Sequence, residues 1–317
     1  MKRLLGFFLF FILIANAQAG TSTIFIDVIS WQVREGGADN WAQVIPPAGL
    51  SVPARIIPAP FEWNKGLRLG IGYVFASTGH DIALIYTTYH TLATSQAQGV
   101  VASSFDGNYF ANNTNGASLG PTYQSAAIRW QFYYKTLDLI AGHRFNLKHE
   151  LQFHPYVGLR LASINQSIFS NWYHPTTPTT FSSATENLKN NFFGIGPSIG
   201  IDTTWPLFPG NSQSISLMGN FIGALLYGHW HFSDIYANNT PVNININVSS
   251  VNGAAPMLGG LLGFQWTKQF AHSSLSASIG YEVQAWFNQI QFYSLNGGRF
   301  NRSTFIQGGD FEVQYHF

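Results

Sequence analysis

The chain has 317 residues, a formal net charge of +1 and no cysteine. The absence of cysteine excludes a disulfide framework and thiol chemistry, and the near-zero charge gives no indication of nucleic-acid binding. Only 9% of the residues are charged and 16% are aromatic, whereas an ordinary soluble domain has about 25% charged residues. After residue 19 the apolar residues are interleaved with polar ones, so no apolar run reaches the length of about 18 residues that a transmembrane helix needs. This composition is typical of a membrane-spanning β-barrel.

The start of the chain has the organisation of an export signal. The basic pair Lys2-Arg3 precedes an apolar run, and Ala17-Gln18-Ala19 offers small residues at the two positions that a signal peptidase needs. The apolar run is too short to span a membrane as a helix. We therefore predict that residues 1–19 are a cleaved signal peptide and that residues 20–317 form the mature protein.

Ten segments of the mature chain alternate apolar and polar residues with a period of two, which predicts β-strands with one apolar face. Together they predict an all-β, antiparallel, up-and-down transmembrane barrel of about ten strands, with eight or twelve as alternatives. The fourth segment changes phase between Tyr134 and Leu137, so we expect a β-bulge there. The predicted strands cover residues 23–34, 66–75, 81–90, 125–145, 151–164, 192–205, 214–232, 255–267, 274–292 and 309–317.

Long polar connections alternate with short turns along the chain. This pattern is typical of outer-membrane barrels, in which short turns face the periplasm and long loops face outward, and it predicts that both termini are periplasmic. Within the fourth connection, Val242–Val248 alternates apolar residues with Asn and is expected to extend a hairpin above the membrane. A soluble β-sandwich is the alternative, in which the export signal and this alternation would be coincidences. The five long surface loops are predicted after Arg34, His90, Ile164, Phe232 and Phe292.

Aromatic residues gather near the predicted strand ends and are expected to form two interfacial girdles. The last strand ends on Tyr315 and Phe317, which resembles the signal that the barrel-assembly machinery recognises, so we assign these two residues to an assembly signal. The girdle residues on the periplasmic side are predicted to be Phe75, Trp205, Phe208, Trp266, Phe270 and Phe317, and those on the outer side Tyr227, Trp230, Phe232, Phe292 and Tyr293.

Charged side chains of both signs are predicted on the inward face of the strands, together with Tyr133, Tyr156 and Trp286. A balanced set can pair across the lumen and close it, or it can line a small conducting pore. Because ten strands enclose little more space than side chains can fill, the closed or narrowly conducting barrel is favoured over a general porin. The predicted lumen-lining residues are Asp27, Arg68, Asp81, Arg129, Lys135, Asp138, Arg144, Arg160, Asp202, Glu282, Asp310 and Glu312.

Short glycine- and aromatic-rich motifs occur in a characteristic order along most of the mature chain. They are Phe61-Glu62-Trp63 with Gly72-Tyr73, Phe193-Gly194-Ile195-Gly196-Pro197 with Gly200-Ile201-Asp202, Pro256-Met257-Leu258 with Leu262-Gly263, and Gly280-Tyr281. In this layout the chain resembles the Legionella-type major outer-membrane proteins. The resemblance implies an abundant surface barrel, described as a porin and as a host-attachment factor. Because this chain has no cysteine, oligomerisation through disulfides is not carried over.

The sequence contains no motif of catalysis that we recognise, and we expect no enzymatic activity and no cofactor. His229 and His231 are separated by one residue, but no third ligand is evident, so we predict no metal site. An omptin-like protease or a lipase on the same kind of barrel is the alternative function, although few charged groups were found in the predicted outer loops. These are Glu35, Asp39, Asp106, Glu186 and Asp234. The expected partners are outer-membrane lipids, the barrel-assembly machinery and, from the resemblance, host surface molecules, and nucleic acid is not expected.

Overall fold

The structure is a computed structural model in which thirteen β-strands and no helix are described. The described residues are 20–36, 40–46, 52–103, 122–147, 151–176, 179–210, 212–240, 243–294 and 298–317, so the predicted signal peptide lies outside them. Among them, no helix is long and apolar enough to cross a membrane. The strands are β1 (Gly20–Glu35), β2 (Asn40–Ile45), β3 (Arg55–Pro58), β4 (Asn64–Phe75), β5 (His80–Ser103), β6 (Tyr123–His143), β7 (Phe145–Asn146), β8 (Gln152–Pro175), β9 (Ser183–Phe208), β10 (Gln213–Asn238), β11 (Asn243–Gln269), β12 (Ser274–Ser294) and β13 (Gly298–His316).

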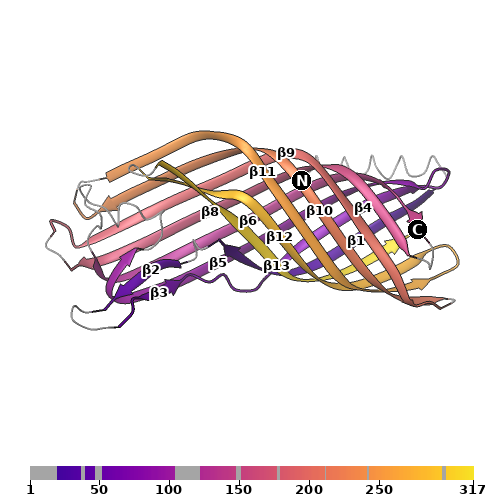
Figure 1. Ribbon diagram of the computed structural model, residues 1–317, viewed down its shortest axis with the longest axis horizontal. Coiled ribbons are helices and arrows are strands. Elements are labelled where there is room, and N and C mark those ends of the chain that lie inside the picture. The colour runs from indigo at the N-terminus through magenta and orange to yellow at the C-terminus, as the bar shows by residue number, and fades with distance from the viewer. Residues whose placement is uncertain are drawn as a thin grey trace.

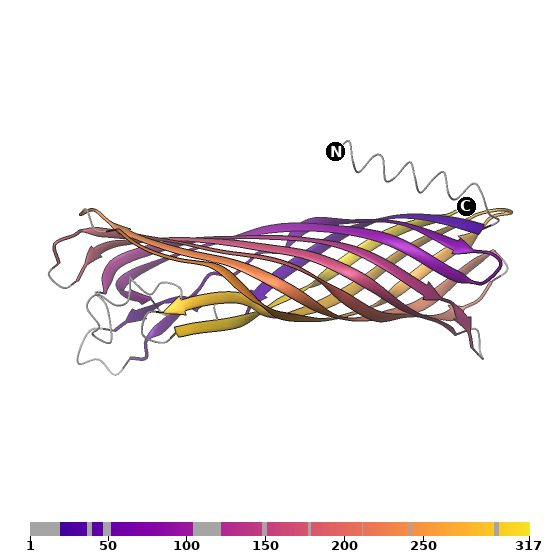
Figure 2. The same cartoon turned by 90° about the horizontal axis from the view of Figure 1, so that it is seen from above.

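Ten long strands close into an antiparallel barrel, which confirms the predicted fold (Figures 1 and 2). Strand β1 closes the ring, because it pairs with β4 on one side, where Ile26 lies opposite Leu69, and with β13 on the other, where Val28 lies opposite Phe311. Strands β2 and β3 form a hairpin beside the far end of β5, and β7 pairs briefly with β8. Closure leaves no free edge in the ring, so the backbone groups within hydrocarbon are paired inside the protein.

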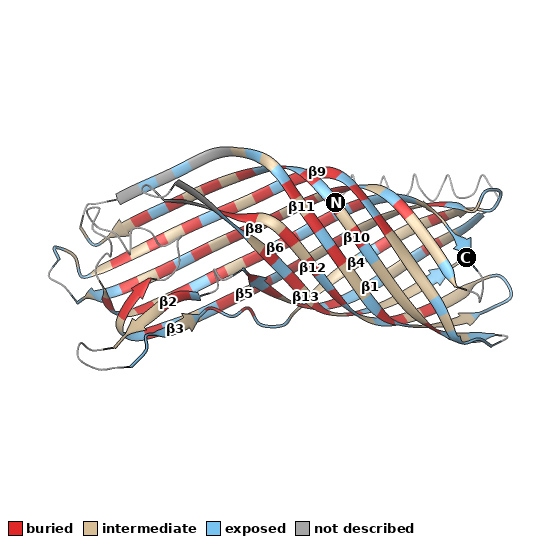
Figure 3. Ribbon diagram, viewed as in Figure 1, coloured by how far each residue is buried: buried red, intermediate tan, exposed pale blue. Residues whose placement is uncertain are grey.

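The half of the barrel next to the short turns has an apolar outer face and a polar interior. On β1, Ile24, Ile26 and Val28 are 46–48% exposed, whereas Asp27 between them is fully buried inside the barrel. Figure 3 shows this alternation of buried and exposed residues along the tilted strands. An outward apolar face over a polar lumen is the arrangement that a bilayer requires of a β-barrel. We call this half the membrane band.

The other half of the barrel has the opposite polarity, as β6 shows most directly. Near the short turns Leu139 points outward and Asp138 inward, whereas further along the strand Arg129 points outward and Trp130 inward. The pairing of β6 with β8 is continuous from Ser125 to Gly142, so the predicted bulge is wrong. The strand keeps its parity, and the medium around it changes from hydrocarbon to water. We call this half the extension.

The strands continue into stretches that were predicted to be loops. Strand β8 runs to Pro175 and β9 begins at Ser183, so most of the loop predicted after Ile164 is paired strand. The predicted hairpin is present, because Ile244 of β11 lies opposite Tyr236 of β10. The sequence predicts loops in these stretches because their outward residues are Ser, Asn and Thr, which in the extension face water.

The interior of the extension is filled by aromatic side chains. Phe61, which lies between β3 and β4, places its ring 5.4 Å from that of Trp130 and 6.2 Å from that of Phe132. Nearer the membrane band, the rings of Tyr134 and Trp286 lie 5.7 Å apart. We call this packed interior the aromatic core. Its largest fully buried side chains include Trp31, Trp41, Phe61, Tyr89, Tyr123, Trp130, Phe132, Tyr134, Trp172, Phe192, Trp230 and Trp286.

Part of the predicted outer girdle belongs to this core. Trp230 and Phe232 are 1% and 2% exposed, so they point into the barrel and their assignment to a lipid-facing girdle is wrong. Tyr227, three residues before Trp230, is exposed on the outer face as predicted. The side chains of Phe292 and Tyr293 lie outside the described residues. The interior of the extension attracts these rings because water, not lipid, surrounds the wall at this height.

The change of polarity predicts a position-dependent cost for a charge on one face of β8. Leu159→Arg places a charge in the membrane band and should destabilise the inserted barrel by about 2–4 kcal/mol. Ser167→Arg, on the same face of the same strand but in the extension, should have little effect. Urea titration of the protein folded in lipid vesicles measures both. Equal losses of unfolding free energy would contradict the position of the boundary.

Candidate functional site

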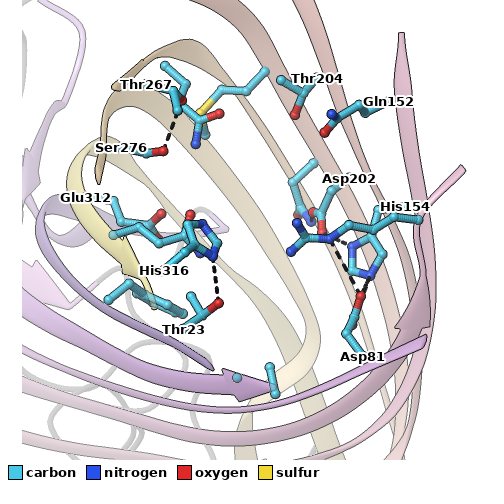
Figure 4. Close-up of a pocket in the computed structure, with 18 of the residues that line it drawn as sticks. Thr23, Asp81, Gln152, His154, Asp202, Thr204, Thr267, Ser276, Glu312 and His316 are labelled. Carbon is cyan, nitrogen blue, oxygen red and sulfur yellow. Dashed lines mark hydrogen bonds and ion pairs between the residues drawn. The ribbon is translucent and has the colours of Figure 1, made fainter. Parts of the chain in front are cut away.

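A polar cavity of about 1460 Å³ occupies the interior of the membrane band and opens among the short turns. We call it the vestibule. Figure 4 shows His154 and Asp202 on one wall and Glu312 and His316 on another, with the polar side chains of Thr204 and other residues around them. The residues that line it extend inward to Tyr134, Met257 and Gln284, where the aromatic core begins.

Three ion pairs, centred on two arginines, form a layer between the vestibule and the aromatic core. Arg68 of β4 donates to Asp27 of β1 at 2.8 Å and to Glu282 of β12 at 2.6 Å. Arg160 of β8 donates through two nitrogens to the carboxylate of Asp138, its directly opposite neighbour on β6, with one of the distances being 3.1 Å. Because all five side chains are largely buried, each charge depends on its partner for stabilisation. We call these five residues the ionic layer.

Amide and hydroxyl groups join the ionic layer to the aromatic core. Gln284 donates to Glu282 at 2.8 Å, and its carbonyl oxygen accepts from Tyr134 at 3.0 Å and from Trp286 at 2.9 Å. Arg160 also lies 3.1 Å from the sulfur of Met257. These contacts satisfy polar groups that would otherwise be buried without partners, so the boundary between the polar and the aromatic interior is rigidly specified.

A histidine lies between two aspartates near the mouth of the vestibule. Nε2 of His154 is 2.9 Å from an oxygen of Asp81, and Nδ1 is 2.9 Å from an oxygen of Asp202. The other oxygen of Asp202 accepts a hydrogen bond from Asn220 at 2.6 Å, and Asn220 also donates to Tyr156 at 2.9 Å. These contacts fix the ring orientation of His154. No group of three residues able to hold a metal ion occurs among the described residues.

A comparison with protein families decides where the chain belongs. The model of the Legionella pneumophila major outer membrane protein precursor matches residues 24–317, which is nearly the whole chain. The chain belongs to this family. Family membership and the closed barrel together place the protein in the outer membrane.

Similar solved structures are also outer-membrane barrels, at low identity. The outer membrane protease OmpT from Escherichia coli is 12% identical over 95% of this chain and 98% of its own, with a TM-score of 0.46. The Pseudomonas putida toluene transporter TodX is 10% identical over 96% of this chain and 90% of its own, with a TM-score of 0.27. These similarities are too low to carry an argument about activity. A search of curated proteins finds no match.

Most of the predicted lumen charges line the vestibule or belong to the ionic layer. Arg129 and Lys135 are exceptions, because their side chains point outward from β6 and are exposed, and the prediction for them is wrong. Tyr133 is exposed on the same face. Periodicity predicts that the apolar side of this part of β6 faces lipid, whereas in the structure that side packs in the aromatic core. The predicted residues that line the vestibule are Arg68, Asp81, Asp138, Arg144, Arg160, Asp202, Glu282, Asp310 and Glu312.

Some residues of the site carried no charge signal in the sequence. Asn220 and Gln284 are neutral amides, and Met257 is an apolar residue that contacts an arginine. Their inward parity was the one sequence signal available for them. Their contacts cross the interior of the barrel between strands that are far apart in the sequence. Tyr134 of β6, for example, donates a hydrogen bond to Gln284 of β12.

Three of the acidic residues that were predicted in outer loops are buried inside the extension. Glu35, Glu186 and Asp234 are at most 1% exposed and lie on β1, β9 and β10. Burial raises the pKa of Asp234 to about 7, and a hydrogen bond to Glu186 opposes part of that shift. Asp39 and Asp106 lie outside the described residues. Glu35, Glu186 and Asp234 are therefore part of the packed interior of the extension.

The ionic layer predicts an asymmetric response to substitution. Arg160→Met leaves Asp138 buried without its partner and should destabilise the barrel by about 3–5 kcal/mol. The double substitution Arg160→Met with Asp138→Asn removes both charges and should recover most of that loss. Urea titration in lipid vesicles gives the coupling free energy from the four-member cycle. Additive effects of the two substitutions would show that the pair is not formed.

The carboxyl pair in the extension predicts a decrease of stability with rising pH. Because the folded pKa of Asp234 is raised, the folded state holds a proton that the unfolded state releases between about pH 4 and pH 7. Unfolding free energy should fall by on the order of 1 kcal/mol per pH unit in this window. Asp234→Asn should flatten the profile, as thermal unfolding at pH 5 and pH 7.5 can measure. An unchanged slope in this variant would contradict the assignment.

Proposed function

We propose that this outer-membrane barrel is closed to general diffusion and acts at the cell surface through its extension, as a platform for attachment. The observation that carries the proposal is the aromatic core, which fills the barrel between the vestibule and the outer end. Six tryptophans are among its fully buried side chains. A ten-stranded barrel has little interior space to begin with, so such a core leaves no wide path.

The extension has the features of a display surface. Four consecutive strands, β8 to β11, continue beyond the membrane band, and the β2–β3 hairpin adds to the wall at the end of β5. Most of the outward residues that the structure describes on these strands are polar, but Phe169, Tyr173 and Ile235 are exposed by 39–42%. Exposed aromatic residues on a rigid polar surface are common anchors of protein–protein contacts. They support attachment through the wall of the extension as well as through the long connections.

The proposed orientation places the short turns and the vestibule mouth in the periplasm. The first residue of β1 and the last residue of β13 lie at this end, where Ser22 and Phe317 exchange backbone hydrogen bonds. A chain exported from the periplasmic side would then insert with both termini on that side, as in other barrels of this kind. The long connections and the extension would face outward.

Two other functions fit the described residues less well. A narrow ion-conducting path remains compatible with the vestibule but would have to pass the ionic layer and the aromatic core. A surface enzyme of omptin or lipase type would need carboxylates accessible to substrate, whereas Glu186 and Asp234 are buried. We therefore propose that the protein is not an enzyme.

Single-channel recording of the refolded protein in planar bilayers tests closure. The wild type should show conductance far below that of a sixteen-stranded porin, which has an open aqueous channel. The double substitution Phe61→Ala with Trp130→Ala removes two packed rings of the core and should raise the conductance severalfold. Phe305→Ala, an exposed aromatic residue on the outer face, is the matched control. A large, stable wild-type conductance would overturn the proposal.

Attachment is tested with the same protein in nanodiscs. Binding to host-cell surfaces should decrease when Phe169 and Tyr173 are both replaced by Ser, while conductance and folding stay unchanged. Phe311→Ser, which lies in the membrane band, should not affect the binding of correctly inserted protein. Undiminished binding by the double variant would contradict a contact role for this wall.

A further inference from the structure

The vestibule contains more carboxylates than cationic partners. Its lining includes six carboxylates and three arginines. Arg160 is engaged by Asp138 and Arg68 by Glu282. Arg144 reaches Asp81 at 3.7 Å. The carboxylates are Asp81, Asp138, Asp202, Glu282, Asp310 and Glu312, and the arginines are Arg68, Arg144 and Arg160.

The histidines of the vestibule do not remove this excess, because among the described residues only His154 of His154, His272 and His316 lies within 4 Å of a carboxylate. His154 contacts both Asp81 and Asp202, so in its charged form it would balance one further carboxylate. Two carboxylates of β13, Asp310 and Glu312, would still have no ion-pair partner within 4 Å among the described residues. The imbalance is therefore located on one strand.

Asp310 is the more informative of the two residues. It is 5% exposed, it lines the vestibule, and its Oδ1 oxygen has no hydrogen-bond partner. A buried carboxylate oxygen without a partner is unfavourable unless a cationic group can reach it. Glu312 lies two residues further along β13, on the same face, and also lines the vestibule. The pair offers acceptor oxygens to a cation that enters from the mouth.

We propose that the vestibule binds a linear organic polyamine, with one ammonium group at Asp310 and Glu312 and another at Asp202. Figure 4 shows Glu312 and Asp202 on facing walls of the cavity. Asp202 has a half-exposed side chain, and an ionised carboxylate has room for more than the two hydrogen bonds that it accepts here. A flexible chain carrying several ammonium groups can meet both walls at once.

The form of the cavity favours this ligand over a bare metal ion. The carboxylates are spread over a cavity of about 1460 Å³, and no group of three ligands is close enough for a metal among the described residues. Apolar side chains such as Ile140, Ile222 and Leu261 also line it and can contact the methylene groups of a polyamine. Because the aromatic core closes the inner end, the ligand would enter and leave by the mouth. This inference goes beyond the proposed surface function and does not depend on attachment.

Isothermal titration with spermidine tests the site in the full-length mature protein refolded in a zwitterionic detergent. One saturable site should appear, and its affinity should fall as salt is raised. Asp310→Asn combined with Glu312→Gln should weaken binding by about tenfold or more, since two charge-assisted contacts are removed. Glu62→Gln, which removes an exposed carboxylate near the start of β4, should bind as the wild type does.

The alternative outcomes are separable. Equal weakening in the Glu62→Gln protein, or an equal affinity for Mg²⁺, would show attraction by net charge alone and overturn the proposal. Saturable binding that the Asp310 and Glu312 variants leave unchanged would also overturn it. If the double variant fails to refold, Glu312→Gln alone carries the test, because this side chain has no ion pair to lose. Single-channel conductance decides the closed-barrel proposal independently of either result.

Discussion

The fold depends on the closure of one sheet onto itself, because a backbone N–H or C=O left unpaired within hydrocarbon is too costly to tolerate. Once β1 has paired with both β4 and β13, every long strand has two neighbours and the wall has no edge. The pleat then assigns alternate residues to the two sides of that wall. The polarity of the side chains on each face then depends on whether that face meets hydrocarbon, water or packed protein at a given height.

The wall crosses from hydrocarbon into water, and its two faces exchange their polarity at that boundary. In the membrane band, leucine and isoleucine face outward and ionic groups face inward. In the extension, polar residues face outward and tryptophan, tyrosine and phenylalanine pack inside. The ionic layer lies at the boundary between the polar interior of the membrane band and the aromatic core of the extension. There Arg68 and Arg160 each contact residues of other strands. The polar and aromatic parts are thus successive levels of one sheet.

The sequence predicted the barrel, its ten strands and the faces of most strands in the membrane band, because a period of two is a local property. It failed where the same period continued into water. In β6 the apolar parity of Ile128 to Tyr134 marks the core, and the error placed Arg129 and Lys135 inside. The rings of Trp230 and Phe232 were misplaced for the same reason. Periodicity reports which face is apolar, but it does not report what lies beyond that face.

The candidate site was predictable in its charges and less so in its contacts. Parity placed Asp138 and Arg160 inside, but their pairing follows from the strand register, which puts them directly opposite each other. The insertion of Phe61 into the core could not be read from the sequence, since it comes from a segment between strands. Contacts of this kind are set by the closed geometry of the ring.

The position of Arg68 has a consequence for how the barrel is made. Its guanidinium joins β4 to β1 and then reaches past β13 to Glu282 on β12. The segments that it links are separated by 214 residues of chain and come together at the seam between the first and last strands. This triad can form only when the seam is shut. The Arg68–Asp27 pair can form as soon as β1 and β4 pair, whereas the Arg68–Glu282 pair needs the closed seam, so Arg68 stabilises the closed ring more than it stabilises an open sheet.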